Sequence, residues 1–131
     1  MNLPARLTEV SRTSDYASLK AFAELSNDFN PIHIDREFAA KTPMKQLIAH
    51  GPLATIMLWQ SLGRTLGADA LARASLDLRF LKPVFENDTA TAGGELRTNA
   101  GESGTACYDV WVRNQKGDTL VQGTARLRAG T

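Results

Sequence analysis

The sequence is poor in the residues on which several classes of protein depend. Its 131 residues include one cysteine, Cys107, and two histidines, His33 and His50. A single cysteine excludes an internal disulfide and fits a reducing compartment, and two histidines exclude a metal site that needs several of them. Basic and acidic residues nearly balance, at 15 against 14, whereas proteins that bind phosphate backbones usually carry a marked basic excess. Nucleic acid is therefore not expected as a partner.

Long hydrophobic runs are also absent. The longest stretch without Asp, Glu, Lys or Arg covers residues 46–63 and is interrupted by polar side chains, whereas a bilayer span needs about 20 predominantly apolar residues. The N-terminal residues show no apolar segment behind a basic start, so no secretory signal is expected. We therefore expect one domain over residues 1–131, with a cytoplasmic location and no membrane contact. This length buries a core without disulfides or metals.

The first half of the chain has helical spacing. Apolar residues recur every three or four positions from Tyr16 to Ser26, which predicts a helix capped by Thr13 or Ser14. A short helix is expected after Asp35. A third helix, over residues 52–63, is apolar around most of its circumference and begins with Gly51 at the cap and proline at the first helical position.

The second half alternates between apolar and polar residues, which predicts strands. The alternation covers residues 75–80, 106–113 and 119–128, and a hairpin turn is expected at 114–117. Residues 88–96 are expected to form a strand with a bulge at Gly93 and Gly94, and Leu7 and Val10 an N-terminal strand. The simplest packing curls this antiparallel sheet around the apolar helix, which gives an α+β fold.

The densest cluster of polar residues lies between Asp28 and Asp35. Pro31 fixes its own backbone angle and biases Asn30 away from helix, so the segment is a defined turn. Asp28 and His33 can point into one cavity across this turn, and a carboxylate with an imidazole is a workable acid–base pair near neutral pH. The alternative is purely structural, because Asp and Asn commonly form Asx-turns and helix caps.

A second cluster is His50-Gly51-Pro52 at the start of the apolar helix. A helix N-terminus presents unpaired N–H groups and a partial positive charge, and glycine lets a ligand approach closely. Such an N–H is a suitable donor to an oxyanion; alternatively, the residues only begin the helix and His50 packs. No metal is expected, because the histidines, Cys107 and the carboxylates lack the close spacing of zinc ligands.

Together these residues resemble a known family. The segment from Ser26 to Ala39, SNDFNPIHIDREFA, followed by IAHG ending at Gly51, is similar to the hydratase-2 signature of the MaoC-like dehydratases, which include the (R)-specific 2-enoyl-CoA hydratases. A later element, FLKPV followed by Asp88, also resembles that family, so the likeness covers roughly residues 15–128. Asn27 and Asn87 stand where the family usually has glycine, and asparagine tolerates a left-handed backbone better than most residues.

The resemblance implies a hot-dog fold, a curved antiparallel sheet wrapped around a long central helix and normally paired into a homodimer. It implies an enzyme of fatty acid metabolism that reversibly hydrates a 2-enoyl thioester carried on coenzyme A or acyl carrier protein, without cofactor or metal. Asp28 and His33 fall on the catalytic pair, and Gly51 falls on the glycine of the oxyanion hole. Asn30 falls on the asparagine that orders the loop. The residues expected to contact substrate are Asn30, His50, Trp59 and Leu62.

Two points stay open at this level. The bulk of Trp59 favours short or unusual acyl chains, although an ordinary core tryptophan is at least an equal alternative. The rival functions are a hot-dog thioesterase, which could use a lone carboxylate, and a non-catalytic subunit that binds acyl thioesters.

Overall fold

The computed structural model describes residues 3–98 and 104–128. No helix in these residues is long and apolar enough to cross a membrane. The elements are, in chain order, β1 (Val10–Thr13), α1 (Tyr16–Ser26), α2 (Pro31–Ile34), α3 (Arg36–Ala40), α4 (Gly51–Leu66), α5 (Ala68–Leu71), β2 (Ala74–Phe80), β3 (Thr89–Thr98), β4 (Thr105–Arg113) and β5 (Thr119–Arg128).

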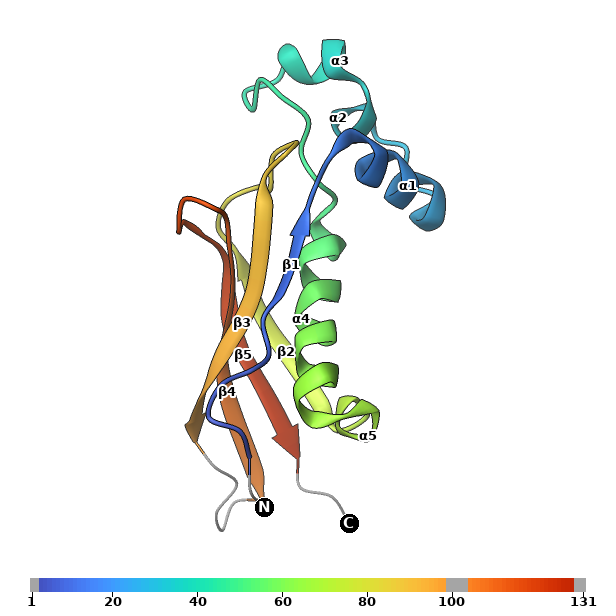
Figure 1. The fold of residues 1–131 in the computed structure, drawn as a ribbon. Coiled ribbons are helices and arrows are strands. Elements are labelled where there is room, and N and C mark those ends of the chain that lie inside the picture. Colours follow the sequence, from blue (N-terminus) through green and yellow to red (C-terminus); the bar gives the residue numbers. More distant parts are fainter. Residues whose placement is uncertain (1–2, 99–103, 129–131) are drawn as a thin grey trace.

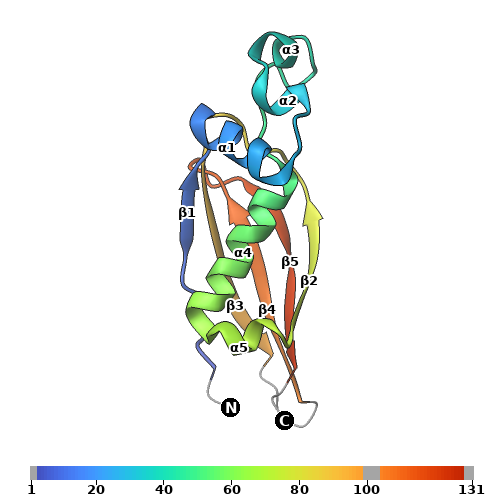
Figure 2. The same cartoon turned by 90° about the vertical axis from the view of Figure 1, so that its right-hand side faces the viewer.

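The strands form one antiparallel sheet in the order β1-β3-β4-β5-β2. The sheet is curved, and α4 runs along its inner face (Figures 1 and 2). The predicted alternation in β4 is confirmed, because Ala106, Tyr108, Val110 and Val112 are buried while the residues between them are less so. This is the expected α+β architecture, the hot-dog arrangement of a sheet wrapped around a central helix.

The core lies between α4 and the sheet. Leu58 and Leu62 of α4 are 0% and 1% exposed and pack in one cluster with Tyr108 and Val110. Burial of a large apolar side chain contributes about 1.5–3 kcal/mol each. Ser61 adds a polar tie, since its hydroxyl donates to the carbonyl oxygen of Thr8 at 2.6 Å. The sheet thereby fixes the position of α4, and with it the position of the helix N-terminus.

Helices α1, α2 and α3 lie together beyond one end of the sheet, next to the start of α4 (Figures 1 and 2). Arg36 of α3 pairs with Glu86, between β2 and β3, at 2.5 Å, and its guanidinium stacks over the ring of Tyr16 at 4.4 Å. The Tyr16 hydroxyl in turn donates to the carbonyl oxygen of Ile34 at 3.1 Å. These contacts join all three helices to the β2–β3 connection.

The helix boundaries correct three expectations. Asp15, not Thr13 or Ser14, caps α1, because its carboxylate accepts from the Ser18 N–H at 2.8 Å. Helix α4 extends to Leu66, and the residue at its N-cap is His50 rather than Gly51. Helix α2 was not expected, because a proline directly after a turn can equally begin a helix. The cap at Asp35 is confirmed by its hydrogen bond from the Phe38 N–H.

The expected bulge at Gly93 and Gly94 is wrong. Both residues pair regularly with β4, and the register shifts only between Leu96 and Thr98. Close approach explains these glycines instead, because a Cβ on Gly93 would lie 3.2 Å from Nε1 of Trp111, and one on Gly94 2.6 Å from a backbone oxygen of β4. The hairpin turn at 114–117 is confirmed by a backbone hydrogen bond between its ends.

The two asparagines that replace the expected glycines adopt the left-handed backbone. Asn27 has a φ of 56° and Asn87 a φ of 70°. Asparagine adopts this region at little cost compared with β-branched residues. The expectation that both turns survive the replacement is therefore confirmed.

Candidate active site

The turn between α1 and α2 is ordered by its own side chains. Asn27 ends α1, and the next N–H, of Asp28, donates to the carbonyl oxygen of Ala23 at 3.1 Å. Oδ1 of Asp28 accepts from the Asn30 N–H, and Oδ1 of Asn30 accepts from the Ile32 N–H, each at 3.2 Å. The structural roles considered for Asp28 and Asn30 are thus real. They use only one oxygen of the Asp28 carboxylate.

The second carboxylate oxygen of Asp28 faces His33. Oδ2 lies 3.9 Å from Nε2 of His33, and the two side chains are 50% and 10% exposed. This separation is too long for a direct hydrogen bond. One water oxygen can reach both atoms at ordinary hydrogen-bond lengths. The turn therefore brings together the predicted pair in a geometry suited to holding a water molecule.

The tautomer of His33 follows from its partner. Nδ1 lies 2.7 Å from the carbonyl oxygen of Ile48, and since a carbonyl only accepts, Nδ1 carries the hydrogen. Burial lowers the pKa of His33 below its ordinary 6.5; His50 also lowers it, while the bond to Ile48 and the charge of Asp28 oppose the shift. A neutral His33 then presents the lone pair of Nε2 to the space beside Asp28.

His50 is buried and contacts both Asp28 and His33. It is 2% exposed, its Nε2–H donates to the backbone carbonyl oxygen of Asp28 at 3.0 Å, and its ring stacks on that of His33 at 3.8 Å. Phe22 of α1 contacts the His50 ring at 4.9 Å between centroids. The fold thus joins His33 and His50, 17 positions apart in the sequence, into one unit with Asp28.

Asp28, His33 and His50 also have the composition of a metal site, and their ligand atoms lie within 4.8 Å of one another. Sequence spacing did not foresee this cluster. Its geometry suits a tetrahedral zinc poorly, because stacked rings direct their in-plane lone pairs side by side rather than toward one point. One nitrogen of each ring bonds a backbone carbonyl, which leaves Nε2 of His33 and Nδ1 of His50 as the nitrogens without a hydrogen. The cluster fits an acid–base pair better than a metal centre.

The N-terminus of α4 lies directly next to this cluster. His50 occupies the N-cap, but its side chain makes no capping hydrogen bond, because the ring is bonded to Asp28 instead. Pro52 has no N–H, and the Leu53 N–H donates to the His50 carbonyl oxygen at 3.1 Å. The N–H of the exposed Gly51 is therefore the donor that the helix end offers to a ligand.

An apolar groove continues from Gly51 along the outer side of α4. Its volume is about 520 Å³, and the lining residues are Gly51, Pro52, Thr55, Ile56, Trp59 and Phe80. A second hollow of about 450 Å³ shares Ile56 and Trp59 and extends to Gly63, Ala68 and Leu71. Trp59 thus lines both hollows and lies between them. This position favours a role in binding the acyl chain over an ordinary core role.

Leu62 is not part of this groove. It is 1% exposed and packs in the core against the sheet, because a step of three residues from Trp59 turns its side chain about 60° away. We therefore treat Leu62 as a core residue. Sequence analysis missed Ile56, which is 39% exposed, and Phe80, which is 54% exposed. Nothing in the local sequence connects Phe80, on the edge strand β2, to α4.

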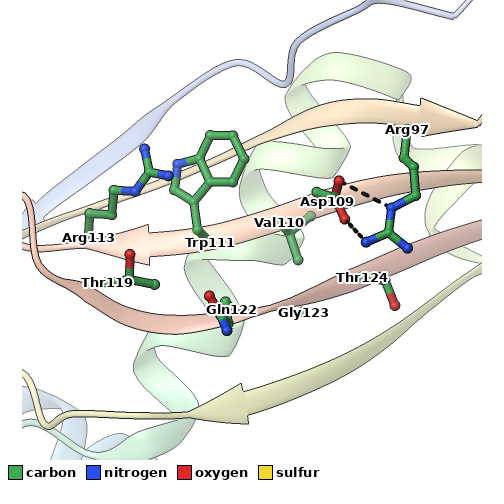
Figure 3. A pocket seen from close by; sticks show the side chains of 9 residues that line it. All are labelled: Arg97, Asp109, Val110, Trp111, Arg113, Thr119, Gln122, Gly123 and Thr124. Carbon is green, nitrogen blue, oxygen red and sulfur yellow. Dashed lines mark hydrogen bonds and ion pairs between the residues drawn. The ribbon is translucent and has the colours of Figure 1, made fainter.

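A further hollow lies on the opposite, outer face of the sheet (Figure 3). Its volume is about 320 Å³. Asp109 there is neutralised by an ion pair with Arg97 at 2.5 Å, and Arg113 stacks over Trp111 at 4.3 Å. Because its carboxylate is paired and no imidazole lines it, this hollow does not offer the acid–base chemistry of the Asp28–His33 pair.

Comparisons with known proteins find related sequences. A family model described as MaoC like domain matches residues 4–115. An (R)-specific enoyl-CoA hydratase of Aeromonas caviae is 34% identical over 119 residues, which cover 91% of this chain and 89% of that protein. A 3-hydroxybutyryl-CoA dehydratase of Methylorubrum extorquens is 36% identical over 88 residues, covering 66% of this chain and 56% of that protein.

Solved structures show the same fold. The structure of the (R)-hydratase from A. caviae involved in PHA biosynthesis superposes with a TM-score of 0.83 at 29% identity, over 99% of this chain and 98% of that one. An R-hydratase from Pseudomonas aeruginosa superposes with a TM-score of 0.80 at 26% identity, over 98% and 82%.

The buried position of His33 predicts the pH range in which its ring takes up a proton. Because burial lowers its pKa, we expect the ring to be neutral at pH 7 and to take up a proton only below pH 6.5. NMR titration of the ring signals measures this directly, and the signals are assigned by their loss in His33→Ala. A midpoint above 6.5 would contradict the buried, Nδ1-bonded arrangement.

Proposed function

The chain belongs to the MaoC-like domain family, and from this premise we propose that it reversibly hydrates 2-enoyl thioesters as a single domain over residues 1–131. The observation that carries the proposal is the Asp28–His33 pair, which stands beside the free N–H end of α4 and the apolar groove. An acid–base pair, a donor for an oxyanion and a channel for an acyl chain are the three parts that the reaction needs. The names of the relatives support the same activity.

In the proposed reaction a water molecule lies between Oδ2 of Asp28 and Nε2 of His33. Both atoms are hydrogen-bond acceptors, so each receives one O–H of the water. Asp28 removes one proton as the water oxygen attacks Cβ. The electron pair of the C=C bond moves to Cα and the thioester carbonyl, which forms an enolate.

The enolate oxygen is held by the Gly51 N–H at the positive end of the α4 dipole. Neutral His33 has no proton on Nε2, so the proton that reaches Cα is the one that Asp28 took from water. Return of that proton restores the carboxylate and completes addition of water to one face of the double bond. The reverse sequence dehydrates a 3-hydroxyacyl thioester. None of these steps calls for a cofactor.

The substrate is proposed to be a thioester of coenzyme A or acyl carrier protein, with its acyl chain in the groove beside α4. Asn30 orders the turn that carries Asp28, as its hydrogen bond to Ile32 supports. We propose a role in fatty acid metabolism, which this substrate class supports, and a cytoplasmic location, which is consistent with the lone cysteine.

A homodimer is proposed because one side of the groove and one edge of the sheet are open in the single chain. Strand β2 is an edge strand, which presents unpaired backbone groups to a second strand. Phe80 at its end and Ile56 of α4 are exposed beside the groove. A second copy that pairs along β2 would bury these side chains and close the groove.

The first prediction concerns the pair itself. We expect Asp28→Asn and His33→Ala each to fold normally and to lose about 10²- to 10⁴-fold in hydration of crotonyl-CoA. The first removes the group that takes and returns the proton, and the second removes the acceptor that orients the water. The assay follows the conjugated double bond and free thiol together. Asp69→Asn, an exposed carboxylate on α5, is the matched control.

The same assay separates the rival functions. Loss of the double bond without thiol indicates a hydratase, release of thiol indicates a thioesterase, and neither change indicates a binding subunit. Wild-type activity in either variant of the pair would refute the proposed roles of Asp28 and His33.

Trp59 is expected to limit chain length. Its replacement in Trp59→Ser joins the two hollows along α4, so kcat/KM for octenoyl-CoA relative to crotonyl-CoA should rise about tenfold or more. Trp111→Ser, on the outer face of the sheet, is the control and should leave this ratio unchanged. An unchanged ratio in Trp59→Ser would count against the limit.

The dimer is tested by light scattering coupled to gel filtration. We expect a mass twice the 14.2 kDa of one chain. Phe80→Asp places a charge at the end of the open edge and should shift the equilibrium toward monomer on dilution. Leu25→Asp changes an 82% exposed leucine on α1 and should not. A monomeric wild-type protein would reject the proposed pairing.

A further inference from the structure

His50 is buried against both members of the pair rather than exposed in the groove. At 2% exposure it has almost no surface with which to touch a substrate, although the sequence led us to expect a substrate contact. Its ring instead contacts Asp28 by a hydrogen bond and His33 by stacking.

The two contacts act on different parts of the pair. The bond from Nε2–H to the carbonyl oxygen of Asp28 fixes the backbone that carries the carboxylate. The stack, at 3.8 Å and an interplanar angle of 23°, supports the face of the His33 ring and limits its rotation about the bond to Ile48. One side chain therefore sets the position of both reacting groups relative to each other.

The other nitrogen of His50 indicates that the ring is not present for core packing alone. With the hydrogen on Nε2, Nδ1 is a buried acceptor, and it has no hydrogen-bond partner within the described residues. A buried polar atom without a partner is costly and uncommon. Unfavourable features such as an unpartnered buried polar atom are concentrated at functional sites, where activity requires them despite the loss of stability.

We propose that His50 is a positioning residue that sets the separation and orientation of Asp28 and His33 without touching the substrate. This inference rests on the proposed hydration at the same site. It assigns His50 two separable duties, which are the hydrogen bond to the Asp28 backbone and the ring support beneath His33.

His50 also influences the protonation of His33. The pKa of His33 is lowered first by burial and to a smaller extent by His50 at the start of α4, while the hydrogen bond to Ile48 and Asp28 in the turn before α2 raise it. Loss of the imidazole at position 50 therefore raises the pKa of His33. Activity that requires neutral His33 would then be lost at a higher pH as the solution is acidified.

Two variants separate the duties. His50→Phe keeps a flat ring beneath His33 but cannot donate to Asp28, whereas His50→Gln retains an N–H donor and loses the ring. We expect kcat for crotonyl-CoA to fall about 10- to 100-fold in His50→Phe with KM changed less than about threefold, because displaced reacting groups slow the reacting step. His50→Gln should recover most of that loss, and in both variants the acid limb of the pH profile should move to higher pH.

NMR titration of His33 provides a readout without substrate. We expect its midpoint to rise in both folded variants relative to wild type. If His50→Phe does not fold, His50→Asn replaces it, because its shorter amide cannot reach the Asp28 carbonyl oxygen, and it should be slower than His50→Gln.

The outcomes are decisive. Unchanged kcat in the variant without the donor overturns the positioning role. An equal loss in His50→Gln overturns the hydrogen bond as the main positioning contact, and an unchanged His33 titration in the folded variants overturns the influence of His50 on the pKa of His33. An inactive wild-type protein whose His33 titration still shifts rejects the proposed hydration but supports His50 as the residue that governs His33.

Discussion

The backbone of Ile48 holds the chemistry-bearing turn against the rest of the molecule. Its N–H donates to the carbonyl oxygen of Ile32 at 3.2 Å, and its carbonyl oxygen accepts from Nδ1 of His33 at 2.7 Å. Ile48 is itself fixed by a bridge to Phe85. A single extended residue therefore sets the place, the ring orientation and the tautomer of His33, and three positions later the same chain segment begins α4.

This connection explains how a site can be built mostly from a short turn and a helix end. The buried leucines of α4 fix this helix against the sheet. The position of α4 in turn fixes the segment directly before it, which contains Ile48 and is hydrogen-bonded to α2. The Asp28 turn is then held from both sides, by α1 through the left-handed Asn27 and by His50 through the bond to its carbonyl oxygen. Rigid elements thus determine the 3.9 Å gap between Asp28 and His33, rather than the flexibility of a loop.

Sequence reasoning reached the fold through periodicity, because alternation in residues 106–113 and the apolar helix leave little choice of packing. It reached Asp28, His33 and Gly51 through a local motif whose residues all lie within two short segments. It placed Leu62 in the substrate groove wrongly and missed Ile56. Helical spacing shows which residues share one face of α4, but it does not show which face the sheet covers. It could not foresee Phe80 or the stack of His33 on His50, since these contacts exist only after β2 and α4 have found their places.

Asp28 can order its turn and also act in the reaction, because its carboxylate can accept more than one hydrogen bond. A carboxylate has room for several donors; at Asp28 one oxygen orders the turn through the Asn30 N–H and the other is left for water. His33 likewise spends one nitrogen on the Ile48 carbonyl oxygen and keeps the other. Both remaining atoms are acceptors, which matches the two O–H groups of one water, while the Gly51 N–H at the start of α4 is a donor that matches the oxygen that gains charge in the proposed reaction. A thioesterase would direct the same water at the carbonyl carbon of the thioester, with Asp28 returning the proton it takes to the departing sulfur. The position of the water relative to Cβ or to the carbonyl carbon therefore decides between the two reactions, and the donors and acceptors serve both.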